Sequence, residues 1–380
     1  MKRLYLLRHC LSCLFAVHVC LAAAPGSSST QSALGWVPAH TWVFAVGVLS
    51  WKHSEMFGSF PIKDRRDTEL VDFFRRSGVP EQQIVYLQDK QATQKEIDTA
   101  LLEQLKQVGR DDLLIIYYAG HGVKSRKTGD VYLASYDAGD KGVDGWSVNS
   151  IPQKTAANCA CQRVLWFMDC CYSGQAASAI SSHGDSPAFA CVTSSSASEV
   201  STGHWTFTEA LLDAFRGKAY VDLNHDGAIT LAEFASHAER DMAFAEEQLA
   251  TFATTDGFDR QMVLAHAPAL ENEQIGERAQ LQWQNDWYTV RVIESKNGRL
   301  KVHYIGYGEN EDLWVTPDKL RPIKPLQYAV GSTVDVLWQK KWYPATVLKV
   351  KDGIHLIHYT DYDSTWDEWV SSKRIRRAKS

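Results

Sequence analysis

The 380-residue sequence predicts an α/β domain built on a mostly parallel sheet with helices on both faces, followed by two small all-β barrels. Two observations support this prediction. Up to residue 267, apolar runs of four to nine residues alternate with stretches of helical periodicity, the order of elements that builds a parallel sheet. After residue 274, a pattern of aromatic residues occurs twice at a constant offset of 55 positions. Each copy has room for three to five short strands joined by tight turns, so each is expected to form a small barrel.

Apolar runs in the first part of the chain predict strands that are buried on both faces. These strands are expected at residues 41–49, 84–87, 113–119, 131–134, 164–168 and 188–193. Helical periodicity and capping residues predict helices at 67–76, 93–108, 147–160, 207–217 and 231–248. Thr93 and Glu96 have the spacing of a capping box, and Gly78 with Pro80 ends the first helix. Helices at these places would cover both faces of the sheet.

The first 24 residues have the pattern of an export signal. Met1-Lys-Arg3 and Arg8 supply positive charge, residues 10–21 are apolar, and Ala22-Ala-Ala24 offers small residues for cleavage. The apolar run is shorter than the ~20 residues that a membrane-spanning helix needs. We therefore predict a signal peptide at 1–24, a linker at 25–40, and an exported protein, periplasmic or secreted, with no membrane span after signal removal.

The composition excludes a disordered or membrane-embedded protein, because 45% of the residues are hydrophobic and 22% are charged. Residues 25–273 contain 20 Lys and Arg against 32 Asp and Glu, whereas residues 274–380 contain 17 against 13. The acidic first part favours cationic substrates. The positive excess of the second part is too small to indicate nucleic acid by itself, so we expect no nucleic-acid partner; a protease that its C-terminal part leads to nucleic acid stays open as an alternative.

Two of the predicted strands are each followed by a chemically reactive residue. Residues 113–119 lead into Gly120-His121-Gly122, and residues 164–168 lead into Asp169-Cys170-Cys171. Parallel strands present their carboxyl ends at one edge of the sheet, where α/β sheets bind ligands. A cysteine beside an imidazole is activated as a thiolate. The two motifs therefore predict a Cys–His dyad, with the two residues 50 positions apart.

Together, Tyr117-Tyr-Ala-Gly-His-Gly122 and Asp169-Cys-Cys-Tyr-Ser-Gly174 resemble the paired signature of caspase-fold peptidases, above all the metacaspases and their bacterial relatives. The resemblance covers residues 41–267. It implies a caspase-like sheet and cysteine endopeptidase activity on protein or peptide substrates.

The same resemblance assigns roles to single residues. Cys171 would be the nucleophile and His121 the base, and the N–H groups of Gly122 and Cys171 would form the oxyanion hole. Asp169 and an acid near the start of helix 67–76 would line a pocket that selects Arg or Lys. For the second acid, Asp67 fits best by spacing.

Asp64 is the alternative for that second acid, and an alternative function also stays open. A caspase-like body without activity would be a scaffold or binding protein that acts through its C-terminal barrels. The presence of both His121 and Cys171 favours the enzyme. Residues 175–187 contain no Lys or Arg, so we expect no self-cleavage there and either a single-chain protein or one nicked at exposed basic sites such as Lys124 to Lys127.

The predicted mature chain retains an odd number of cysteines, which leaves one thiol unpaired in an oxidising compartment. They are Cys159, Cys161, Cys170, Cys171 and Cys191. Neighbouring residues of a strand point in opposite directions, so only one of Cys170 and Cys171 can face the cleft. Cys170 is expected to be a buried bystander.

Residues 222–233 match every fixed position of the twelve-residue EF-hand loop. The predicted calcium ligands are Asp222, Asn224, Asp226, Ala228, Thr230 and Glu233. Ca²⁺ is therefore the expected cofactor, and no organic cofactor is expected. A single EF-hand without a partner binds calcium weakly.

The repeated C-terminal pattern aligns residues 276–323 with 331–378 without a gap, within predicted barrels at 274–323 and 328–378. It resembles Tudor-like barrels of the Tudor-knot or Agenet type, which have an SH3-like fold. The resemblance implies an aromatic cage that receives cations or a peptide ligand. The cage candidates are Tyr304, Tyr307, Trp314, Tyr359, Tyr362 and Trp369. The alternative that these aromatic residues form the small barrel cores stays open.

Overall fold

The structure of the chain is a computed structural model. It describes residues 35–139, 145–184, 186–197, 203–323, 327–338, 341–351, 353–371 and 374–378. The predicted signal peptide and residues 25–34 of the predicted linker lie outside the described residues.

A six-stranded sheet forms the centre of the α/β domain, with strand order β10-β8-β7-β3-β1-β2. Its strands are β1 (Thr41–Gly47), β2 (Ile84–Gln88), β3 (Leu113–Ala119), β7 (Arg163–Asp169), β8 (Ala188–Thr193) and β10 (Thr251–Thr254). All neighbouring pairs are parallel except β10 with β8. The predicted caspase-like α/β fold with a mostly parallel sheet is confirmed.

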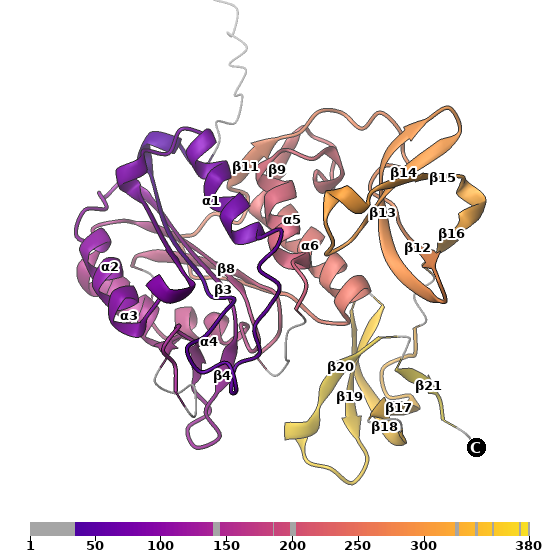
Figure 1. Cartoon of the computed structure of the whole chain (residues 1–380). Coiled ribbons are helices and arrows are strands. Elements are labelled where there is room, and N and C mark those ends of the chain that lie inside the picture. The colour runs from indigo at the N-terminus through magenta and orange to yellow at the C-terminus, as the bar shows by residue number, and fades with distance from the viewer. Residues whose placement is uncertain are drawn as a thin grey trace, which may run out of the picture. The chain divides into compact units, whose positions relative to one another are not determined.

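Helices cover both faces of this sheet, as Figure 1 shows. One face packs on α1 (Arg66–Arg76), α5 (Thr206–Phe215) and α6 (Leu231–Asp241). The other packs on α2 (Gln94–Leu105), α3 (Ser150–Asn158) and α4 (Gln175–Ser181). Alternate residues of each strand enter the two cores, so Phe167 faces α5 and α6 while Trp166 faces the opposite layer. Buried strands of this kind are continuous apolar runs, which is why they were visible in the sequence.

Two small sheets complete the domain. β4 (Gly122–Lys124), β5 (Val131–Leu133) and β6 (Trp146–Ser147) form one of them, directly after the predicted catalytic histidine. The other pairs β9 (Ala228–Thr230) with β11 (Val263–His266). The helix expected at 231–248 ends at Asp241 and continues as one π-helical turn, Met242–Glu246.

Residues 35–40 are docked on the domain, although the sequence predicts a linker there. Trp36 is only 4% exposed, and its ring lies 5.8 Å from Phe74 and 5.6 Å from Phe215, measured between ring centroids. Its indole N–H donates to the carbonyl oxygen of Leu264 at 2.8 Å. The physical reason for the difference is this buried aromatic side chain, which anchors the segment after the Ser- and Gly-rich stretch.

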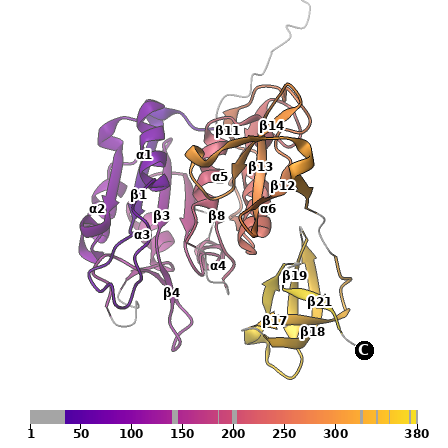
Figure 2. The ribbon, with the colours of Figure 1, turned by 45° about the vertical axis from the view of Figure 1, so that its right-hand side comes forward.

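The C-terminal part contains two five-stranded antiparallel sheets, each with its own apolar core. The first β module consists of β12 (Arg278–Trp283), β13 (Asp286–Lys296), β14 (Arg299–Tyr304), β15 (Leu313–Val315) and β16 (Leu320–Pro322). The second consists of β17 (Thr333–Trp338), β18 (Lys341–Lys351), β19 (Ile354–Tyr359), β20 (Glu368–Val370) and β21 (Ile375–Arg377). Every strand recurs at the offset of 55, and so does the register shift after Val292 and Val347. Figure 2 shows each module as a separate set of short strands.

Buried ion pairs hold the first module to α6. Asp241 is 1% exposed, and Arg278 Nε donates to its Oδ1 at 2.6 Å while Arg291 Nη2 donates to its Oδ2. Arg291 is also 1% exposed, and its Nη1 donates to Nε2 of His237 at 2.9 Å. At the positions of Arg278 and Arg291, the second module has Thr333 and Thr346. The docking residues therefore distinguish the two copies of the repeat.

In the described part of the chain, no helix combines the length and the unbroken apolar character that crossing a membrane requires.

Candidate functional site

Strand register brings the two predicted catalytic residues to the same place. β3 and β7 are parallel neighbours, with Ala119 opposite Asp169. His121 and Cys171 each follow their strand by two residues, so they leave the sheet side by side at its carboxyl edge. The backbones are in close contact here, because a Cβ atom on Gly122 would collide with the carbonyl oxygen of Cys171. Only glycine fits at position 122 without moving the backbone at Cys171.

A backbone carbonyl orients the imidazole of His121. Its Nε2 lies 2.8 Å from the carbonyl oxygen of Gly58. A carbonyl can only accept, so Nε2 carries the proton and Nδ1 of the neutral ring keeps the lone pair. The ring packs against both Trp51 and Phe60, each with its centroid 4.5 Å away. Burial lowers the pKa of His121, which favours the neutral form that acts as a base.

The turn after Cys171 is held to the segment that follows β8. Tyr172 has a left-handed backbone, with φ of 56°. The Ser173 N–H donates to Oγ of Ser195 at 3.2 Å, and Ser195 Oγ donates to the Cys170 carbonyl at 3.0 Å. A Cβ on Gly174 would collide with backbone atoms of Ser196 and Ala197. The sequence did not identify these serines as the residues that hold the turn after Cys171, although the run Ser194-Ser-Ser196 directly follows a buried strand.

Both cysteines that follow β7 are buried. Cys170 is 1% exposed and belongs to the core on the α2–α4 face, and burial raises the pKa of its thiol well above the ordinary value. Cys171 is 8% exposed. Cys159 and Cys161 form a disulfide, and the described residues include Cys191 as a third free cysteine.

Asp169 lines a pocket of about 380 Å³, which we call the Asp169 pocket; Ala119 and Gly120 also line it, whereas His121 and Cys171 do not. Its carboxylate accepts a hydrogen bond of 2.6 Å from Thr208 Oγ1, which in turn lies 2.7 Å from the hydroxyl of Tyr117. Burial raises the pKa of Asp169 to about 6, and the hydrogen bonds from Thr208 and Ser194 only partly oppose this shift. A buried carboxylate that is held by neutral hydrogen-bond donors can receive a cation.

The second predicted pocket acid is corrected. Asp67 is fully buried, and its carboxylate receives Arg65 Nη2 at 2.6 Å and the Tyr86 hydroxyl at 2.7 Å. Its charge is therefore matched from within the chain, because Arg65 directly precedes α1 and folds back onto it. Asp64, which the sequence left as the alternative, lines the Asp169 pocket.

The first β module supplies one wall of the Asp169 pocket. Gly306, Tyr307, Gly308 and Glu311 line it opposite residues of the α/β domain. The Gly306 N–H donates to Oε2 of Glu209 at 3.0 Å, and Arg66 Nη2 donates to the Tyr307 carbonyl at 3.3 Å. No sequence pattern signalled this contact, because its partners lie about 100 and 240 positions apart.

Each β module contains a cluster of aromatic rings. In the first module, Tyr288, Tyr304 and Tyr307 have centroids 5.9 to 6.3 Å apart in edge-to-face arrangements. We call the adjoining pocket of about 310 Å³ the first aromatic pocket; it is lined by Trp283, Tyr288, Tyr304, Tyr307, Glu311 and Leu313. In the second module, the corresponding cluster consists of Trp338, Tyr343, Tyr359, Tyr362 and Trp366.

Two of the predicted cage residues lie elsewhere. Trp314 does not line the first aromatic pocket; its neighbour Leu313 does, and adjacent residues of a strand face opposite sides. Trp369 packs on Leu249 and Ile354. Sequence reasoning missed Tyr288 and Tyr343, although the recurring Trp-Tyr pair at 287–288 and 342–343 was a usable signal.

The predicted calcium loop forms a compact turn around Asp222. Oδ2 of Asp222 accepts from the Gly227 N–H at 2.8 Å, whereas Oδ1 is buried and has no hydrogen-bond partner among the described residues. Glu233 accepts from the N–H groups of Leu223 and Thr230, at 3.0 and 2.9 Å. In the described ranges, no three His, Cys, Asp or Glu side chains converge as a metal site.

The other predicted ligands sit on the same turn. Asn224, Asp226, Ala228 and Thr230 are joined by local hydrogen bonds, such as Asn224 Oδ1 accepting from the Asp226 N–H at 2.8 Å. The orphaned oxygen of Asp222 fits a cation, while Glu233 would have to exchange its N–H partners for the ion.

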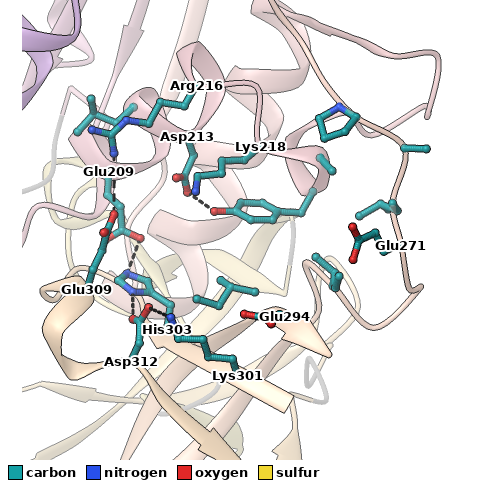
Figure 3. Close-up of a pocket in the computed structure, with 18 of the residues that line it drawn as sticks. Glu209, Asp213, Arg216, Lys218, Glu271, Glu294, Lys301, His303, Glu309 and Asp312 are labelled. Carbon is teal, nitrogen blue, oxygen red and sulfur yellow. Dashed lines mark hydrogen bonds and ion pairs between the residues drawn. The ribbon is translucent and has the colours of Figure 1, made fainter. Parts of the chain in front are cut away.

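A second cavity, of about 430 Å³, lies where the first module meets α5 (Figure 3). At its edge His303 lies between two carboxylates, with Nδ1 2.7 Å from Asp312 and Nε2 2.9 Å from Glu209. Burial opposes protonation, but the hydrogen bonds with Asp312 and Glu209 prevail and raise the pKa of His303 to about 10. His303 is therefore a cation at neutral pH and ties the module to the domain.

Comparisons with known proteins agree with this architecture. The caspase domain model matches residues 63–274, and the Tudor-knot model, described as the RNA binding activity-knot of a chromodomain, matches residues 328–377. No curated protein sequence matches the chain significantly.

Several solved structures are similar to parts of the chain. The crystal structure of protein GSU0716 from Geobacter sulfurreducens has 15% identity and a TM-score of 0.43, and the alignment covers 61% of this chain and 99% of that one. AGDP1 AGD34 from Arabidopsis thaliana has 17% identity and a TM-score of 0.14, with coverage of 28% and 83%. The tandem Agenet domain 3-4 of ADCP1 has 18% identity and a TM-score of 0.13, with coverage of 28% and 81%. All three TM-scores lie below 0.5, so none of these likenesses assigns a function. Because the caspase model covers more than half of the 380 residues, the chain belongs to the caspase-domain family of cysteine peptidases, with a Tudor-knot module near its C-terminal end.

Proposed function

We propose that the protein is a cysteine endopeptidase in which Cys171 is the nucleophile and His121 the general base. The observation that supports the proposal is the β3–β7 register, in which Ala119 and Asp169, each two residues before one of these side chains, lie opposite each other. The Gly58 carbonyl supports the same assignment, because it leaves Nδ1 of His121 as the proton acceptor.

The proposed reaction is an acyl transfer. Nδ1 of His121 takes the thiol proton of Cys171, and the thiolate attacks the carbonyl carbon of the scissile bond. The backbone N–H groups of Gly122 and Cys171 stabilise the oxyanion, where one such donor is worth about 2.7–4 kcal/mol. His121 then protonates the leaving amine, and water, deprotonated by the same ring, hydrolyses the thioester.

We further propose cleavage after Arg or Lys. Support comes from Asp169, a buried carboxylate in the pocket, and from Asp64, which lines the same pocket and has, within the part of the chain that the structure describes, only the exposed Lys63 near its carboxylate, at 3.9 Å. Two carboxylates against one bound cation would favour a basic residue over an acidic one. Asp67 has no part in this proposal, since Arg65 already matches its charge.

The test is a peptidase assay of the full chain on short peptides with Arg, Lys, Asp or Ala before the scissile bond. We expect cleavage after Arg and Lys that is abolished in Cys171→Ala. His121→Ala should also abolish turnover and should slow alkylation of Cys171. Cleavage after Asp would retain the dyad but overturn the pocket assignment, and absence of cleavage would favour the scaffold function.

We propose that residues 222–233 bind Ca²⁺ as a structural ion. The proposal is supported by the unpartnered Oδ1 of buried Asp222 and by the pairing of β9 with β11, which supplies the strand that a lone EF-hand lacks. Bound calcium would add a stabilisation of RT ln(1 + [Ca²⁺]/Kd). Thermal melts with calcium or with magnesium should show a calcium-dependent rise in Tm that Asp222→Asn removes. An equal response of the variant would contradict the site.

For the second module we propose a targeting role through its aromatic cluster, with a peptide as the ligand. Trp338 and Trp366 are 37% and 48% exposed, so the cluster is open to a partner. The family description also names RNA, and counterion release gives the discriminating measurement. Binding to RNA that falls steeply with salt would replace the peptide assignment.

Export through the first 24 residues remains part of the proposal. It is supported by the Cys159–Cys161 disulfide, since disulfides persist in oxidising compartments. N-terminal sequencing of the protein recovered outside the cytoplasm should begin near residue 25.

A further inference from the structure

The Asp169 pocket and the first aromatic pocket adjoin each other. Tyr307 and Glu311 line both of them. We infer that the two pockets form one substrate cleft, in which the first β module binds a second cationic side chain of the peptide being cleaved. This inference rests on the proposed peptidase function and adds a subsite that lies outside the caspase domain.

The shared wall has a defined position. Glu209 accepts from the Gly306 N–H at 3.0 Å, and Arg66 donates to the Tyr307 carbonyl at 3.3 Å. The Tyr307 ring lies 5.2 Å from the imidazole of His204, measured between centroids. A Cβ on Gly306 would meet Thr206 Oγ1 at 2.5 Å, so the turn lies directly against the start of α5. The module is thus a fixed part of the cleft.

The chemistry of the first aromatic pocket favours a cation. Three tyrosine rings surround it, and an ammonium or guanidinium group over such rings gains about 0.5–2 kcal/mol. Glu311 adds an exposed carboxylate at the edge shared with the Asp169 pocket. Tyr304 is 6% exposed, and its hydroxyl has no hydrogen-bond partner among the described residues. A ligand group that reaches this hydroxyl would satisfy it.

The second module provides a natural comparison. The position of Glu311 is occupied there by Trp366, and that of Leu313 by Glu368. Glu368 accepts from the Tyr359 hydroxyl at 2.6 Å, so the tyrosine equivalent to Tyr304 has a partner within its own module. The free hydroxyl and the acidic edge therefore belong to the copy that adjoins the Asp169 pocket.

One short peptide can occupy both pockets. An extended chain advances about 3.3 Å per residue, so two side chains a few residues apart reach neighbouring pockets that share two lining residues. The substrate class that follows is a peptide with Arg or Lys at the scissile bond and a further basic residue close to it.

The experiment compares two sets of peptides on the full chain. Both have Arg before the scissile bond; one set carries a single Lys at each nearby position in turn, and the other carries Gln there. We expect one position at which Lys raises kcat/KM about tenfold over Gln. Trp283→Ala and Glu311→Gln should each reduce that Lys/Gln ratio about fivefold or more. Both residues are exposed, so neither change threatens the fold.

Trp287→Ala is the matched control, because Trp287 is an exposed tryptophan of the same module that lines neither of the two pockets. It should keep the wild-type Lys/Gln ratio. A wild-type ratio near one at every position, or a ratio that Trp283→Ala leaves unchanged, would overturn the shared cleft. If no peptide is cleaved after Arg, the proposed function fails instead. The subsite is then tested alone by titrating the Lys and Gln peptides into Cys171→Ala and into Cys171→Ala with Trp283→Ala. Tighter binding of the Lys peptide that is lost with Trp283→Ala supports the subsite, and equal binding of the Lys and Gln peptides refutes it.

Discussion

Replacing Arg291 with Met should destabilise the protein, because this buried arginine joins the first module to α6. Arg291 is 1% exposed and pairs with Asp241, which is also 1% exposed. Its guanidinium carbon lies 4.8 Å from the ring centroid of Tyr220. Removal of the guanidinium would leave part of the Asp241 charge buried and unmatched, whereas Met fills most of the volume.

The magnitude follows from the partners that remain. Breaking a buried ion pair by removing one member costs about 3–5 kcal/mol. Arg278 would still donate to Asp241 at 2.6 Å, so the lower end of this range, about 3 kcal/mol, is expected. At about 2 °C per kcal/mol for a large compact unit, Tm should fall by about 6 °C.

The assay is thermal unfolding of the full chain, with urea denaturation as a second measure. Arg299→Met is the control: Arg299 is exposed in the same module and donates only to the Trp314 carbonyl, so a change within about 0.5 kcal/mol is expected. An Arg291→Met variant as stable as Arg299→Met would refute the view that this buried cluster holds the module to α6.

Three further outcomes are expected. Because the pKa of Asp169 is raised to about 6, the preference for Arg over Ala before the scissile bond should fall as pH drops through 6, and pH profiles of Asp169→Asn should lack that step. Because the folded-state pKa of His303 is raised to about 10, the stabilisation that its proton provides is complete below pH 6.5 and is lost as pH rises through 10. Between pH 6.5 and 10, the Tm of His303→Gln should therefore fall less than the Tm of the wild type. Trp36→Ala should cost about 3–5 kcal/mol in urea denaturation, and a cost below 1 kcal/mol would mean that residues 35–40 are a linker after all.

The sequence predicted the structure best where the burial of a residue depends only on the strand that contains it. Continuous apolar runs predicted β3 and β8 to the residue, and the motifs at the ends of β3 and β7 lie on neighbouring parallel strands. The cage residues were harder, because a strand aromatic can face either the pocket or another surface. Trp369 and Tyr359 are both aromatic residues of the repeated pattern, yet Trp369 packs on Leu249 whereas Tyr359 belongs to the aromatic cluster.

Contacts between distant segments could not be predicted in this way. Asp67 was a reasonable pocket acid until Arg65, two residues earlier, proved to match its charge. The wall formed by Tyr307 and the pairing of Glu209 with His303 join segments about 100 positions or more apart. A single sequence carries no local sign of such contacts, since each depends on how two folded parts meet.

The docking of Trp36 and of the first module bears on how the protein can be shortened. The family match at 63–274 omits β1, which lies between β3 and β2 in the sheet, and it omits the indole that covers Phe74 and Phe215. A fragment cut to those limits would expose apolar surface to solvent, and its Asp169 pocket would lack the wall that the first β module forms. The smallest piece expected to work as an enzyme therefore runs from residue 35 to residue 323, and expression trials that respect only the family limits should yield aggregates.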